Sequence, residues 1–191
     1  MPPSSPVQTV NTLLGHLQSE DFIGAADMID LRDLEGWRRE QLAFLAMAFK
    51  SPKPGSVPIV LEAVPTDPEG IRRLLAEHAR APVRGMDGVS CLAELAAIPA
   101  EELLANYWRL VAREEEGWAW PRPDVVGEFV EGSDARVVCR HEGAQSRGDG
   151  SGTVDVVLKL TGGHWRVRLT EELVTPWLWL LVLPASIPGA A

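Results

Sequence analysis

The apolar residues of this chain change their spacing once, near residues 117–124, and this change restricts the folds open to it. Before it, apolar residues recur every three or four positions, as on the buried face of a helix. From Val125 onward they alternate with polar residues, as in strands that are apolar on one face. Helices followed by an antiparallel meander predict an α+β fold, with N-terminal helices packed on a curved C-terminal sheet of about four strands.

The helical part is predicted over about residues 6–116. Ser5 followed by Pro6 is a typical helix start. Further helices are expected after Asp21, from about Leu34 to Phe49, from Thr66–Glu69 onward, and from Pro99. The helix after Asp21 is expected to place Ile29 on the same face as Phe22. The apolar run at 59–64 is interpreted as an edge strand, and 82–90 as a loop.

The sheet is predicted over about residues 125–173. Gly132-Ser133-Asp134 and Gly162-Gly163 are expected to close hairpins, because two-residue turns need positive φ. Apolar residues on one face are expected to pack on the helices. The other face is expected to carry the polar residues Asp155, Lys159, His164, Arg166 and Arg168. We expect its positive charges to pair with Asp155 and with glutamates of neighbouring strands.

Length and composition predict a single domain over 1–191, with an apolar tail at 174–191. The two cysteines lie far apart and are interpreted as reduced thiols, not as a disulfide framework. No metal site and no cofactor are expected. The net charge of −9 disfavours nucleic acid and anionic membrane surfaces as partners. The longest apolar run, 177–183, is too short to span a membrane. Because the chain opens with a polar segment and not a leader, we expect a cytoplasmic protein.

Two segments carry a resemblance to a known family. Residues 10–30, "VNTLLGHLQSEDFIGAADMID", resemble an opening helix followed by a short helix, and residues 125–173 resemble a terminal meander with a glycine turn and a tryptophan at its last strand. Together these 70 or so residues resemble the nuclear transport factor 2-like superfamily of cone-shaped α+β domains. The resemblance implies a curved sheet wrapped by helices, a pocket inside the cone and frequent homodimers. It implies no single activity, because this fold hosts enzymes, scaffolds and binding domains.

Cys139, His141 and Asp155 are the first candidates for chemistry. Cys139 and His141 are two residues apart and would share a face, so they would suit an activated nucleophile or half a metal site. No further Cys or His follows at ligand spacing, however, and free cysteine is commonly a small core residue. The structural interpretation is therefore a buried thiol near a histidine at the sheet edge.

Tryptophans and one cationic strand are the candidates for binding. Trp108, Trp118 and Trp120 cluster around the change from helix to sheet, and His164 and Arg166 lie on the last strand. These side chains would line a ligand site, or else belong to the core and to a solvated face. Trp177 and Trp179 in the tail are candidates for an interface between subunits, or for packing within their own subunit.

Three hypotheses about function follow. The first is a non-catalytic binding domain of nuclear transport factor 2-like type that holds a small apolar ligand or a protein partner and forms a homodimer. The second is a small lyase, isomerase or cyclase with acid–base residues inside the cone. The third is an acidic immunity or adaptor protein steered to a basic partner. We favour the first, because the chain contains no phosphate-binding glycine loop, nucleophile elbow, HExxH motif or paired CxxC.

Overall fold

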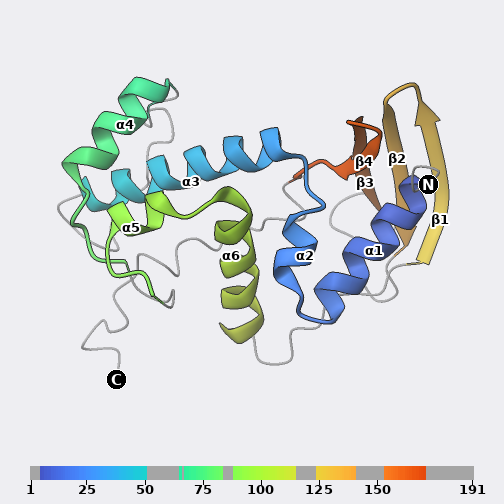
Figure 1. Cartoon of the computed structure of the whole chain (residues 1–191), viewed down its shortest axis with the longest axis horizontal. Coiled ribbons are helices and arrows are strands. Elements are labelled where there is room, and N and C mark those ends of the chain that lie inside the picture. Colours follow the sequence, from blue (N-terminus) through green and yellow to red (C-terminus); the bar gives the residue numbers. More distant parts are fainter. Residues whose placement is uncertain are drawn as a thin grey trace.

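The computed structural model describes residues 5–50, 65, 67–83, 88–114, 124–140 and 153–170 of the chain. Within these ranges the helices come first and the strands follow (Figure 1). The helices are α1 (Pro6–Gln18), α2 (Phe22–Ala26), α3 (Leu31–Lys50), α4 (Pro68–Glu77), α5 (Leu92–Ala97) and α6 (Ala100–Glu114). The strands are β1 (Asp124–Glu131), β2 (Asp134–Arg140), β3 (Thr153–Thr161) and β4 (His164–Val167).

The four strands form one antiparallel sheet in the order β1-β2-β3-β4, and the sheet is not closed. The predicted α+β fold, with helices before a four-stranded meander, is thereby confirmed. Gly132 and Ser133 turn the first hairpin, and Gly162 and Gly163 turn the last. Gly162 and Gly163 both have positive φ, at 60° and 82°, whereas only Gly132 does in the first turn, at 59°. Two positive φ values are typical of a type I′ turn, which fits the last hairpin. A single positive φ at the first position is typical of a type II′ turn, which fits the first hairpin, and both types match the twist of the flanking strands.

Helix α1 is the element that covers the apolar face of the sheet, where it packs against β1, β2 and β4. Ser5 begins α1 with a capping box, in which its side chain and that of Gln8 each accept from the other's backbone N–H. The sheet side of this contact belongs to the main hydrophobic core and consists of Ala135, Val137, Cys139, Leu158 and Val167. The predicted apolar face of the sheet is therefore the buried one.

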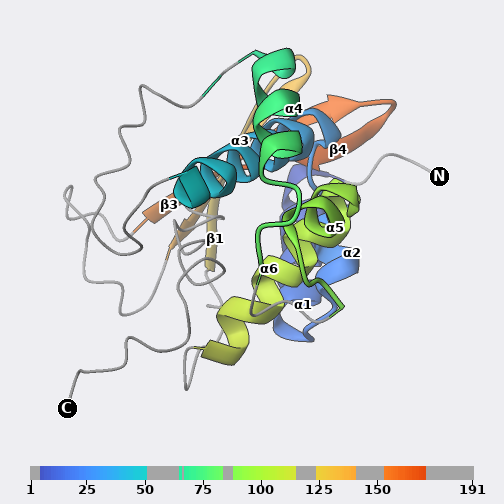
Figure 2. The same cartoon turned by 90° about the vertical axis from the view of Figure 1, so that its left-hand side faces the viewer.

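The remaining helices pack mainly on one another. Helix α2 lies between α1 and α6, while α3 contacts α4, α5 and α6. Two views agree that α3 runs above α2 and α6, with α4 and α5 at the opposite end of the molecule from the sheet (Figure 1, Figure 2). Trp108 of α6 is fully buried, and the Trp37 and Tyr107 rings meet edge to face at 6.0 Å. These aromatic side chains form the centre of the helical layer.

The structure corrects three details of the helical prediction. Helix α2 ends at Ala26, so Ile29 is not helical and instead forms a parallel bridge to Val167. Helix α3 begins at Leu31, three residues earlier than expected, because Asp30 caps it by accepting from the Arg32 N–H at 3.0 Å. Helix α5 was not predicted, because its six residues are too few for a periodic signal.

Two predicted segments fall wholly or partly outside the described residues. The edge strand expected at 59–64 lies outside them, as does the centre of the loop expected at 82–90. On either side of that centre, Pro82 and Cys91 form an isolated antiparallel bridge. This bridge brings the end of α4 next to the start of α5.

Candidate functional site

The outer edge of β1 is the first candidate surface, because β1 is paired on one side only within the described residues. A β-bulge lies between Val125 and Gly127, and from Gly127 the pairing with β2 is regular up to the turn. Large apolar side chains of β1 remain exposed, at 45% for Val126, 58% for Phe129 and 53% for Val130. An exposed and apolar edge strand offers both backbone groups and side chains to a partner.

The register identifies the backbone groups of β1 that face this open edge. Residues flanking a two-residue turn form a hydrogen-bonded pair, so Glu131 and Phe129 bond to β2. Glu128 and Val130, which alternate with them, therefore direct their backbone N–H and C=O groups away from β2. Among the described residues, these outward donors and acceptors have no partner, and they lie beside exposed apolar side chains.

Polar contacts fix both faces of β1. On the helix side, the Glu128 carboxylate accepts from the Val7 N–H at 3.1 Å, so it lies at the N-terminus of α1. On the outer face, the Arg136 guanidinium lies 5.0 Å from the centre of the Phe129 ring. Arg136 also pairs with Asp155 of β3 at 3.1 Å. Phe129 is therefore held against β2 on one side and is open on the other.

The opposite edge of the sheet, at β4, is closed by the segment Met28–Asp30. The Val167 N–H donates to the Met28 carbonyl at 2.9 Å, and the Asp30 N–H donates to the Val167 carbonyl at 2.8 Å. Arg166 donates to the Asp27 carbonyl, which ties β4 to the end of α2. These contacts engage both backbone groups of Val167, so the β4 edge is closed at its end next to α2.

A charged pocket lies where the start of α3 meets the β3–β4 turn and the end of β4. Its volume is about 400 Å³, and its lining consists of Asp30, Arg32, Asp33, Lys159, Leu160, Thr161, Gly162 and Arg168. Arg168 binds Asp33 through two nitrogens, and the second contact, from Nη2 to Oδ1, measures 3.1 Å. This pairing raises the pKa of Arg168, first through the hydrogen bond to Asp33. The site is therefore polar and held by ion pairs.

The structure separates two of the three residues predicted to carry chemistry. Cys139 is buried on the face that packs on α1, whereas Asp155 lies on the opposite, outer face and pairs with Arg136. Burial, and then the charge of Asp155, raises the pKa of the Cys139 thiol. A raised pKa lowers the fraction of Cys139 that is thiolate, the reactive form, at neutral pH. His141 lies outside the described residues. Cys139 and Asp155 do not converge on one point.

The predicted binding residues are likewise spread over the molecule. Trp108 is fully buried in the helical core. His164 is exposed at the β3–β4 turn and Arg166 is half-buried next to it. Outside the described residues lie Trp118, Trp120, Trp177 and Trp179.

The expected ion pairs of the outer sheet face are corrected. Asp155 pairs with Arg136 of β2. Arg166 instead donates to the backbone carbonyl of Asp27, and Arg168 forms an ion pair with Asp33 in the helical layer. The reason is that β4 is a sheet edge, next to the α2–α3 connection. Its arginines therefore meet helix residues before they meet the strands that carry glutamates.

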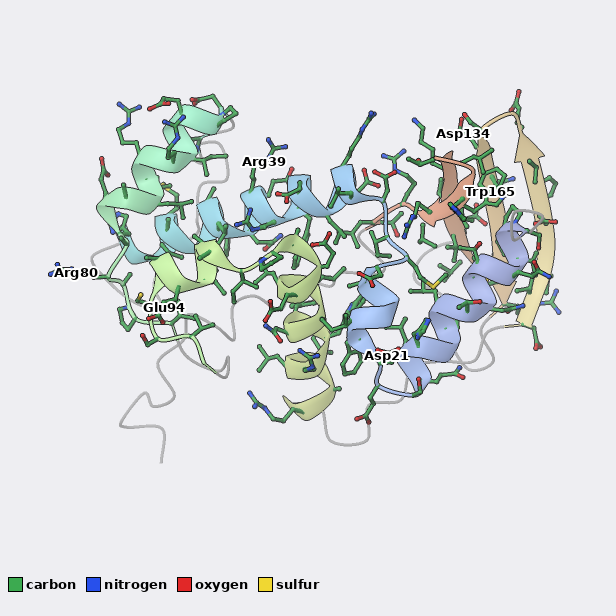
Figure 3. The ribbon with its side chains drawn as sticks, viewed as in Figure 1. Asp21, Arg39, Arg80, Glu94, Asp134 and Trp165 are labelled. Atoms are coloured by element: carbon green, nitrogen blue, oxygen red, sulfur yellow. The ribbon has the colours of Figure 1, made fainter. Side chains whose placement is uncertain are left out.

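A polar corner between α1 and α2 was not predicted. His16 Nδ1 lies 2.7 Å from Asp21 Oδ2, and Asp21 also accepts from the Gly24 N–H at 3.1 Å (Figure 3). These two hydrogen bonds, that from Gly24 first, lower the pKa of Asp21. A Cβ at position 24 would come within 2.7 Å of His16 Nδ1 and closer still to Asp21, so a larger residue there would displace these two side chains. We interpret it as the support of α2.

The pocket residues Asp30, Arg32 and Asp33 were also missed. Their partners, Thr161 and Arg168, lie more than 130 residues further along the chain. No spacing in the sequence connects residues that far apart. The one local signal was Asp30, a capping residue followed by a helical run.

Comparisons with known proteins do not assign this site. No family model, curated protein or solved structure matches the chain. Within the described ranges, no three His, Cys, Asp or Glu side chains are grouped so that they would hold a metal ion. No helix there is long and apolar enough to cross a membrane.

Proposed function

We propose that this chain is a non-catalytic binding domain of nuclear transport factor 2-like type that holds a protein partner along the outer edge of β1. The observation that carries the proposal is the combination of an edge strand of eight residues with the exposed side chains Val126, Phe129 and Val130. Exposed apolar groups on an edge strand are unfavourable in a protein without a partner. An added strand would pair with the outward-facing backbone groups of β1 and cover these side chains.

The charge of β1 indicates the chemistry of the partner. The strand DVVGEFVE contains three acidic residues, Asp124, Glu128 and Glu131, and no basic one, and the whole chain carries a net charge of −9. A second copy of β1 would bring like charges into opposition, which destabilises strand pairs. An extended partner segment that alternates lysine or arginine with apolar residues would complement this edge in charge as well as shape.

The described pocket supports a protein partner over a small apolar ligand. Five of its eight lining residues are charged, namely Asp30, Arg32, Asp33, Lys159 and Arg168. Apolar ligands are held mainly by apolar and aromatic walls. The buried Trp108 packs within the helical core, so it supports the fold.

The test uses a fluorescein-labelled ten-residue peptide of alternating valine and lysine, with a peptide of alternating valine and glutamate as control. We expect saturable binding of the basic peptide, measured by fluorescence anisotropy, and no binding of the acidic one. Val130→Pro removes an N–H that faces the open edge without breaking the bonds to β2, and should lower the affinity by about tenfold or more. Val130→Thr keeps that N–H and a branched side chain, and should leave the affinity within about threefold.

Two outcomes would contradict the proposal. One is equal binding of both peptides, or equal binding by the Val130→Pro and Val130→Thr variants. The other is a dimer in light scattering that the Val130→Pro variant alone dissociates, because a second copy would then occupy the edge.

A further inference from the structure

The charged pocket between α3 and the β3–β4 turn lies at the other edge of the sheet from β1. Its carboxylates have hydrogen-bond partners, whereas two of its cationic groups have none within the part of the chain that the structure describes. Its acceptors are already engaged. Asp33 accepts from two nitrogens of Arg168 and from the Leu169 N–H, the last at 3.1 Å. Asp30, only 6% exposed, accepts from the Arg32 N–H at 3.0 Å and from the Thr161 hydroxyl at 3.4 Å. Neither carboxylate needs a cation from outside.

Two cationic groups in the same pocket are not engaged. Among the residues that the structure describes, no acceptor lies within hydrogen-bond or ion-pair range of the Arg32 guanidinium or the Lys159 ammonium group. Lys159 is half-buried and lies between Arg166 on β4 and Asp134 on β2, and no ion pair joins it to Asp134 in the described residues. Like charges directly opposite one another destabilise a strand pair. Asp134 offsets part of that repulsion, and an anion beside Lys159 would offset more of it.

Arg168 forms part of the pocket wall, but its charge is already paired. Asp33 neutralises it through two parallel hydrogen bonds, which fix the planar guanidinium against the start of α3. The lining charges left without an ion-pair partner among the described residues are then those of Arg32 and Lys159, both positive, and that of Asp30, whose hydrogen-bond donors are neutral. The lining therefore keeps one net positive charge. Because exposed charges more than about 8 Å apart are screened at physiological salt, the net charge of −9 does not prevent a local anion site.

We propose that this pocket binds a small molecule that carries an oxyanion, of carboxylate or phosphate type, between the Arg32 guanidinium and the Lys159 ammonium groups. Arginine presents paired N–H donors that match either group, and lysine adds a point charge. A pocket of about 400 Å³ has room for a small metabolite around the anion. This proposal is independent of the partner surface on β1, because it rests on different residues.

The experiment titrates the ¹⁵N-labelled protein with inorganic phosphate, with succinate and with neutral succinamide. We expect saturable shifts of the Thr161 and Gly162 amide signals with at least one of the two anions and none with succinamide. The anion that saturates at lower concentration identifies the ligand type. Arg32→Met and Lys159→Met remove the charge but keep an unbranched stem, and each should weaken binding by about tenfold.

Arg39→Met is the matched control. Arg39 is an exposed arginine on the same helix, seven residues beyond Arg32, and it does not line the pocket (Figure 3). This variant should bind the anion as the unaltered protein does, with the same melting temperature as Arg32→Met. The proposal is overturned if neither anion gives saturable shifts, or if Arg39→Met weakens binding as much as Arg32→Met.

Discussion

The two edges of the sheet differ in whether their outer backbone groups have hydrogen-bond partners. At β4, the segment Met28–Asp30 pairs with Val167, which is fully buried. At β1, Val130 is 53% exposed and the outer backbone groups have no partner among the described residues. If stability were the only constraint on this sheet, we would expect both of its edges to be covered. The contrast indicates that the β4 edge belongs to the core and that the β1 edge is kept for binding.

The largest expected difference between the two edges is in stability. Val167→Ala removes two buried methyl groups and leaves a cavity beneath the closed edge, which should lower the free energy of unfolding by about 2 kcal/mol. Val130→Ala makes the same chemical change at the open edge and should cost less than about 0.5 kcal/mol. Urea unfolding of both variants checks this. Similar losses for the two would mean that the β1 edge is packed as well.

The next effect concerns the ion pair that holds the closed edge. Asp33→Ala deprives Arg168 and the Leu169 N–H of their acceptor, and because Arg168 is 42% exposed the expected loss is about 1–2 kcal/mol. The control is Glu35→Ala, two residues beyond Asp33 on α3. It removes the contact at 3.4 Å from the exposed Glu35 to Arg38 and should cost less than about 0.5 kcal/mol. Both losses are measured by thermal unfolding. A larger loss of stability for Glu35→Ala than for Asp33→Ala would contradict the role assigned to the Asp33–Arg168 pair.

The smallest effect is a pH dependence at the corner that supports α2. Because hydrogen bonds from Gly24 and His16 lower the pKa of Asp21, its stabilising contribution is present above the ordinary value of 3.8 and is lost as the pH falls through the lowered value. The difference in melting temperature between the protein and its Asp21→Asn variant should therefore shrink as the pH falls below 3.8. A constant difference for Asp21→Asn would contradict the assignment.

Local patterns predicted much of the fold. Ser5 and Pro6 identified the start of α1, Gly162 and Gly163 identified the last hairpin, and the alternation on β3 identified the buried sheet face. Each of these signals depends on residues within about one turn or one strand of each other. Such signals are visible in a single sequence.

The candidate sites depended on features with no such signal. The bulge near Val126 reverses the alternation of β1, so that Val125 pairs with the inward Cys139 while Phe129 pairs with the outward Arg136. Simple alternation would place Val125 and Phe129 on the same face. The pocket likewise depends on contacts between α3 and the end of β4, which only the folded chain brings together.

The most direct test of the contrast between the two edges is hydrogen exchange of individual backbone amides, followed by NMR on the chain alone. The account predicts strong protection for the Val167 and Asp30 amides, whose hydrogen bonds close the β4 edge, and little protection for those of Glu128 and Val130. Adding the basic peptide should then protect the Glu128 and Val130 amides. If these two amides exchange as slowly as that of Val167 without any partner, the β1 edge is already covered and the central claim is wrong.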